Sequence, residues 1–152
     1  MVLPSRPNSG ADDTRGQLGV LIEADDGAGR LLACTLRQRG ARAQPVYVHA
    51  KIGIVDDGWL TLGSANVNEH SLFNDTEVNV VTLDSELARK TRIRLWAEQW
   101  PADELQGDPT QLVDELWRPL ADDPSHQLSR LEHVSPRSRR LLGPLQSHVV
   151  DG

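Results

Sequence analysis

Residues 45–81, PVYVHAKIGIVDDGWLTLGSANVNEHSLFNDTEVNVV, set polar side chains at regular intervals in an apolar frame. Apolar residues alternate from Val46 to Val55, which predicts a strand with one apolar face. His49 and Lys51 share the other face, about 6–7 Å apart along the strand. The rest of the chain has no comparable concentration of polar chemistry in a strand-like pattern.

A turn is expected where this strand ends. The Asp57-Gly58 pair stands between two apolar runs and is a strong signal for a two-residue hairpin turn. In such a turn Asp56 would lie opposite Trp59, and that pairing would set the register of the whole hairpin.

In this register Lys51 lies opposite Ser64, and His49 lies opposite Asn66. Residues directly opposed across an antiparallel pair share a face, so the four side chains would converge on one patch. A three-residue turn would shift the pairing by one and send Ser64 to the other side. We therefore expect only the first register to make a site.

A further strand is expected from Glu77 to Leu83. Glu77 is an acidic residue inside this strand, which is costly unless the carboxylate is paired. The pattern makes Glu77 a candidate partner for a histidine.

Helices are expected around this region. Asp84 or Ser85 can cap a helix that Pro101 ends. Arginines at positions 89, 92 and 94 fit a solvated face of that helix better than an anion site. The remaining expected elements are a helix over 14–24, a strand over 30–38 and a helix over 110–120.

The chain is expected to have two parts. We expect a catalytic half-domain over 1–105 and a helical or irregular extension over 106–152.

Composition narrows the classes of function. The chain has 152 residues and a net charge of −6, and an acidic balance disfavours a nucleic-acid partner. The single cysteine, Cys34, sits in an apolar run and is expected to be a small buried hydrophobe. The histidines lack metal-ligand spacing, so neither a metal nor another cofactor is expected. The sequence shows no signal segment and no apolar run long enough to cross a membrane. We expect a cytoplasmic protein, or one peripheral to the inner face of the membrane.

The central stretch resembles the signature of the phospholipase D superfamily. That signature is HxKxxxxD followed after six residues by GS, and here it is HAKIGIVD, DGWLTL and GSAN. The chain resembles the C-terminal half of a bacterial two-motif, phospholipase D-like or cardiolipin synthase-like protein. The resemblance implies an α/β fold, with a mixed sheet flanked by helices on both faces as one half of an α/β/α sandwich.

The resemblance also implies roles for the motif residues. His49 is the catalytic histidine of a phosphohistidine mechanism, and Glu77 braces it. Lys51 and Asn66 bind the substrate phosphate, where Ser64 assists.

Asp56 completes the motif and is expected to hold the hairpin turn. It stands at the hairpin corner in the predicted register, too far from the histidine for direct catalysis.

The active site of the family takes two such motifs, and this chain has one. Its partner would be a missing first-motif half or a second copy of the chain. The histidine of the second motif is the usual acid/base, so His49 maps to that role, whereas in a homodimer either copy could take either role.

We expect a phosphodiesterase or phosphatidyltransferase acting on phospholipid headgroups, with peripheral membrane contact. The alternatives are a homodimeric single-motif nuclease, and an inactive half or docking module.

Overall fold

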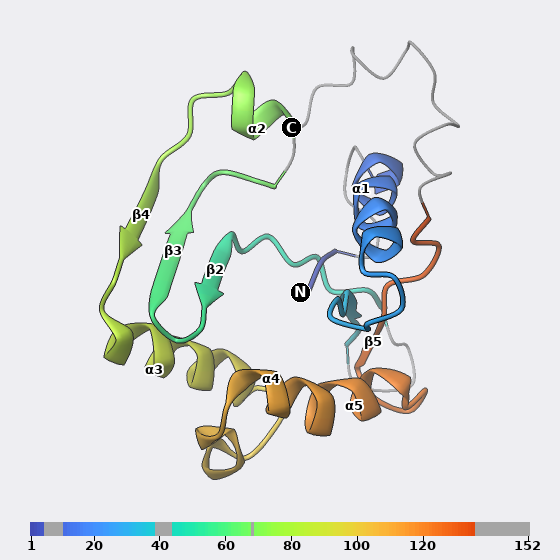
Figure 1. The fold of residues 1–152 in the computed structure, drawn as a ribbon, viewed down its shortest axis with the longest axis vertical. Helices are drawn as coiled ribbons and strands as arrows, with labels where there is room; N and C mark the ends of the chain where they lie inside the picture. The colour runs from blue at the N-terminus through green and yellow to red at the C-terminus, as the bar shows by residue number, and fades with distance from the viewer. Residues whose placement is uncertain (5–10, 39–43, 68, 136–152) are drawn as a thin grey trace. The chain divides into compact units, whose positions relative to one another are not determined.

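The computed structural model describes residues 1–4, 11–38, 44–67 and 69–135. The chain divides into two compact units, one of Met1–His49 with Arg118–Gly152 and one of Ala50–Trp117. Helices and small sheets alternate along the chain (Figure 1), which confirms the expected α/β class. The division at residue 105 stays a prediction, and residues 136–152 of the expected extension lie outside the described residues.

The first unit is built on a short antiparallel ladder. Its elements are α1 (Ala11–Ala24), β1 (Cys34–Leu36), α5 (Arg118–Asp122) and β5 (Leu128–Arg130). β1 pairs antiparallel with β5, and Val2 forms a parallel bridge to Cys34. Cys34 is 1% exposed, as expected of a buried apolar residue. The expected helix over 14–24 is confirmed with an earlier start. Of the expected strand over 30–38, Cys34–Leu36 form the ladder and Arg37 forms an isolated antiparallel bridge to Pro45. The core of this unit consists of Leu18, Leu32, Cys34, Ala121, Leu128 and Leu131.

The second unit holds a three-stranded antiparallel sheet in the order β2-β3-β4. Its strands are β2 (Ile52–Val55), β3 (Trp59–Gly63) and β4 (Asn79–Thr82). The expected strand over 46–55 is confirmed only in its last four residues, and β4 lies inside the expected strand over 77–83.

The turn of the hairpin has three residues, so the predicted two-residue turn is wrong. Val55 pairs with Trp59, which leaves Asp56, Asp57 and Gly58 in the turn. The two aspartates have left-handed φ values of 50° and 51°, and the Gly58 N–H donates to the Val55 carbonyl at 2.9 Å.

This turn moves the register by one residue from the predicted one. Ile52 pairs with Leu62, and the Gly63 N–H donates to the Lys51 carbonyl at 3.2 Å. Lys51 therefore lies opposite Gly63 rather than Ser64.

Two helices follow the strands of the second unit, α2 (Glu69–Phe73) after β3 and α3 (Ser85–Trp96) after β4. The predicted cap is confirmed, because the Asp84 carboxylate accepts a hydrogen bond from the Leu87 N–H at 3.0 Å. The predicted solvated arginine face is wrong at one position: Arg92 is only 3% exposed, whereas Arg89 and Arg94 are exposed.

The segment after α3 is helical but irregular. A 3₁₀-helix, η1 (Ala102–Gln106), precedes α4 (Pro109–Leu112) and a π-helical turn, η2 (Val113–Trp117), which continues into α5. The helix expected over 110–120 is thus confirmed as helical, with a wider turn inside it. Pro119 has no N–H to offer the preceding turn, which accounts for the altered hydrogen bonding there. The ring of Trp117 lies 5.3 Å from that of Trp96 and 5.1 Å from that of Trp100.

Apolar side chains lie exposed on both faces of the three-stranded sheet and just beyond its ends. They are Val55, Leu62, Val78, Val80, Val81 and Leu83, each more than half exposed. Clustered exposure of this kind is typical of a surface that another surface covers. Among the described residues, no helix is both long and apolar enough to cross a bilayer.

Replacing Asp84 with Ala should lower the free energy of unfolding by about 1 kcal/mol, because the N–H of Leu87 loses its side-chain acceptor. Urea denaturation followed by circular dichroism measures the change. Asp84→Asn keeps a capping oxygen and is the matched control. Equal stability of Asp84→Ala and the unmodified chain would show that the cap contributes nothing.

Candidate functional site

A row of three residues crosses the sheet of the second unit at the end of β3. Lys51 lies opposite Gly63, and Gly63 pairs with Asn79 on β4. Opposed residues share a face, so the lysine and asparagine side chains stand on either side of a position that has no side chain. The row therefore brings a cation and an amide to one face.

Gly63 is required by the close approach of β4. A Cβ atom at this position would overlap the Asn79 Oδ1 and the Val78 carbonyl oxygen. The same Asn79 oxygen accepts a hydrogen bond from the Ala65 N–H at 3.3 Å. Glycine thus lets the asparagine side chain lean across β3 and hold the backbone that follows it.

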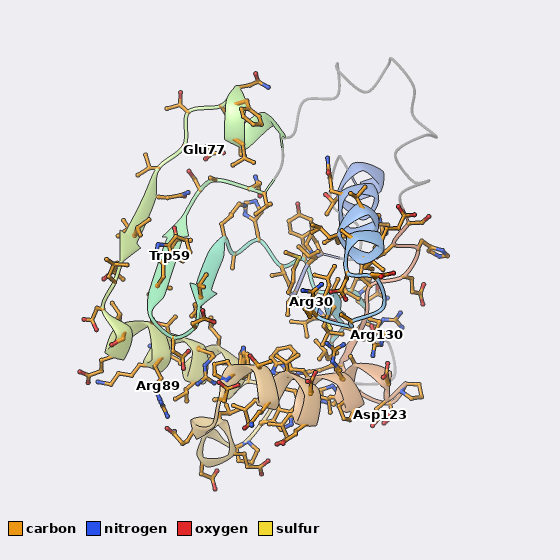
Figure 2. All side chains as sticks on the ribbon, viewed as in Figure 1. Arg30, Trp59, Glu77, Arg89, Asp123 and Arg130 are labelled. Carbon is orange, nitrogen blue, oxygen red and sulfur yellow. The ribbon has the colours of Figure 1, made fainter. Side chains whose placement is uncertain are left out.

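Ser64 reaches Glu77 because β3 ends at Gly63 and the chain bends there. Its hydroxyl donates a hydrogen bond to Glu77 Oε2 and accepts one from the Val78 N–H. Figure 2 shows Glu77 in the segment between α2 and β4. The predicted register is wrong, but in the observed register the bend after β3 still brings the Ser64 hydroxyl to the Glu77 carboxylate.

Hydrogen bonds from Ser64 and Ser71 hold the pKa of the Glu77 carboxyl below its usual value, and the positive charge of Lys51 adds to this effect. Ser71 is itself buried, and its hydroxyl accepts a hydrogen bond from Asn66 Nδ2 at 3.4 Å. We call Ser64, Asn66, Ser71 and Glu77, with Lys51 beside them, the Glu77 cluster.

His49 belongs to the first unit, and its side chain is exposed. Its ring lies 5.8 Å from that of Tyr47, tilted by 31°. The predicted bracing of His49 by Glu77 stays a prediction.

Asp56 lies in the hairpin turn, at the opposite end of β2 from Lys51. Its location at the hairpin corner agrees with the sequence analysis. It is exposed and stands outside the Glu77 cluster.

Sequence reasoning did not include two residues that hold the cluster together, Ser71 and Asn79. Asn79 carried a usable signal, since it lies two residues after Glu77 on the same side of an expected strand. Ser71 carried none, because its role depends on how α2 folds back toward β4. The described residues contain no group of three or more side chains suited to holding a metal ion.

The donor set of the Glu77 cluster suits an oxyanion. An ammonium group, hydroxyls and an amide supply hydrogen-bond donors of the kind that hold phosphoryl oxygens. The ionised carboxylate is able to orient an imidazole by accepting its N–H.

Known proteins share this region of the chain. Residues 23–98, half of the chain, match the family described as "Cardiolipin synthase, PLD-like domain". Phospholipase D zeta 1 of Arabidopsis thaliana is 34% identical over 94 residues, which cover 51% of this chain and 8% of that protein. Cardiolipin synthase A of Pseudomonas fluorescens is 28% identical and that of Pseudomonas entomophila 30%, each over 104 residues. These two matches cover 68% of this chain and 19% of each relative, so the match spans about a fifth of the synthases.

Gly63→Ala should disrupt the pairing of β3 with β4, because the added methyl group meets a backbone oxygen that cannot move without separating the strands. We expect loss of amide protection from hydrogen exchange in β4, measured by NMR. Gly58→Ala is the matched control, since a Cβ there comes no closer than 3.7 Å to its surroundings. Unchanged protection in Gly63→Ala would contradict the steric account.

Ser64→Ala should raise the pKa of Glu77 toward its usual value, because Ser64 is the main cause of the lowering. Carboxyl ¹³C shifts followed by NMR across the acid range measure the change. A lowered pKa favours the ionised folded form, so this stabilisation is present above the unfolded pKa of about 4.3 and is lost as pH falls through the folded value.

Ser125→Ala is the control for this titration. Ser125 also donates to a carboxylate, that of Asp123, at 2.6 Å. Its removal should raise the pKa of Asp123 and leave that of Glu77 unchanged. A Glu77 titration that is identical with and without Ser64 would refute the assigned cause.

Proposed function

The chain belongs to the phospholipase D-like family of cardiolipin synthase, and from this premise we propose that it takes part in phosphodiester cleavage or transfer on phospholipid headgroups. The observation that carries the proposal is the Glu77 cluster. It gathers Lys51, Ser64 and an ionised Glu77 at the end of the hairpin, inside the region that matches the family.

The proposed reaction uses two imidazoles. One nitrogen attacks phosphorus, so that an N–P bond forms while the P–O bond to the departing alcohol breaks. The second imidazole gives its proton to that alcohol, then removes a proton from an incoming water or alcohol. The incoming oxygen attacks phosphorus, and the N–P bond breaks. His49 supplies one of these imidazoles, as the acid/base by its match to the second motif.

Lys51 and Asn66 bind the nonbridging phosphoryl oxygens in this proposal, with Ser64 assisting. Charge-assisted hydrogen bonds from such donors stabilise the charge that develops on these oxygens in the transition state. Glu77 accepts the far N–H of the histidine, which fixes its tautomer and supports the imidazolium form. No step requires a metal.

The second imidazole requires a partner, since this chain carries one motif. A first-motif half supplies it, or a second copy of the chain does. The exposed apolar residues on both faces of the β2-β3-β4 sheet support a partner, because a surface of this kind is costly to leave in water. With water as the acceptor the reaction is hydrolysis, and with a lipid alcohol it is transfer at the surface of a membrane.

His49→Ala should reduce turnover of bis(4-nitrophenyl) phosphate by about 10²–10⁴-fold, the usual contribution of an acid/base group. Release of nitrophenol measures it, with phospholipid vesicles as a second substrate. Where two copies complete the site, the specific activity of the unmodified chain should also rise with protein concentration across the dimerisation range.

His133→Asn is the control for this experiment. His133 is exposed and lies at a left-handed φ of 60°, which asparagine accepts, so turnover should not change. Equal turnover of His49→Ala and the unmodified chain would refute the assignment of His49. Turnover of single-stranded DNA in preference to both other substrates would favour the nuclease alternative.

A further inference from the structure

A buried arginine of α3 holds the turn of the β2–β3 hairpin. Arg92 Nε lies 2.7 Å from Asp57 Oδ1, and its Nη2 lies 2.8 Å from Asp57 Oδ2. This two-point pairing fixes the direction of the carboxylate as well as its distance. Figure 1 shows α3 passing across the end of the hairpin where this turn lies.

The guanidinium of Arg92 is bound on its other sides as well. Nη1 donates to the Leu105 carbonyl at 3.1 Å, and the group stacks over the Trp96 ring at 4.9 Å from its centre. The side chain is 3% exposed, compared with 15% for Asp57. A charge buried to this extent requires its partner, so the pair holds the turn in one place.

The turn conformation is not the one that local sequence favours. Asp56 and Asp57 both have left-handed φ values, which aspartate adopts more often than most residues but at a steric cost that glycine does not carry. An Asp-Gly pair by itself favours a two-residue turn, with Asp57 and Gly58 at its centre. The tertiary contact to Arg92 is therefore the feature that distinguishes the observed turn from its alternative.

The type of turn determines which residue of β3 lies opposite Lys51. In the observed register Lys51 lies in the row with Gly63 and Asn79. In the alternative register each residue of β2 moves by one partner, and the face of β2 that carries Lys51 changes sides relative to β3. The two registers are mutually exclusive arrangements of the same hairpin.

We infer that the Arg92–Asp57 pair is a register selector, which holds Lys51 in its row by excluding the two-residue turn. Arg92 and Asp57 are positioning residues that act through Lys51 without contacting a substrate. The register itself is independent of the proposed function, whereas the effect on catalysis rests on it.

The test is the substitution Arg92→Met, which removes the ion pair and leaves the Asp-Asp-Gly turn sequence unchanged. Cross-strand α-proton contacts measured by NMR report the register directly. The unmodified chain should show Ile54 paired with Leu60 and Ile52 with Leu62. We expect Arg92→Met to lose these contacts and to gain those of the shifted register, such as Val55 with Leu60, which becomes a close, non-hydrogen-bonded pair.

Arg89→Met is the matched control, since it makes the same substitution on the same helix. Arg89, labelled in Figure 2, donates to the Gln106 carbonyl at 2.6 Å and is exposed. This variant should keep the register of the unmodified chain. A folded Arg92→Met that keeps only the original pairs would overturn the inference.

If the Arg92→Met variant does not fold, Arg92→Lys tests whether the Arg92–Asp57 pair selects the register. Lysine keeps the charge but is a single point donor that cannot hold both carboxylate oxygens and the Leu105 carbonyl in the same planar geometry. Coexisting original and shifted pairs support the inference, whereas the original pairs alone overturn it.

Turnover of the phosphodiester is a separate readout on the same variants. A shifted register with at least a tenfold loss of turnover supports the catalytic consequence. A shifted register without such a loss supports the Arg92–Asp57 pair as the register selector, and it contradicts the proposed role of Lys51 in catalysis.

Discussion

The second unit depends on one buried charge and its partner. Arg92 enters the space between the hairpin turn and η1, where it binds Asp57 and the Leu105 carbonyl. Removing one partner of a buried ion pair usually lowers the free energy of unfolding by about 3–5 kcal/mol, because the other charge is left buried without a counter-charge. A hairpin of only four and five residues per strand is marginal by itself. This contact therefore gives α3 and the hairpin a fixed relation, which selects the register that places Lys51 opposite Gly63.

The sequence predicted the features that local chemistry decides. The Asp84 cap and the burial of Cys34 follow from side-chain chemistry that acts over a few residues. The turn could not be predicted in this way, because the Asp-Gly preference is overridden by an arginine 35 residues further along the chain. The same contact explains why the arginine pattern of α3 was misleading. Periodicity identifies a face of a helix, but it does not reveal which charge on that face meets a carboxylate.

The residues of the candidate site were easier to identify than their arrangement. Ser64 binds Glu77 directly, and Ser71 joins Asn66 to Glu77, although the predicted register was wrong. The reason is that β3 stops at Gly63, so strand alternation no longer determines where the next side chain points. The predicted strand over 46–55 was too long for a related reason: an alternating pattern shows which residues are able to pair, while pairing also needs a neighbouring strand alongside.

Gly63 limits how the chain can vary in evolution. Two groups occupy the space of its missing side chain, the amide of residue 79 and a main-chain oxygen of residue 78. A smaller residue at position 79 would clear only the first of them, so no single compensating change restores room for a methyl group. Position 63 is consequently fixed by the spacing of two backbones. Substitutions there would be tolerated only in a chain whose β4 had moved, and such a chain would lose the row that joins Lys51 to Asn79.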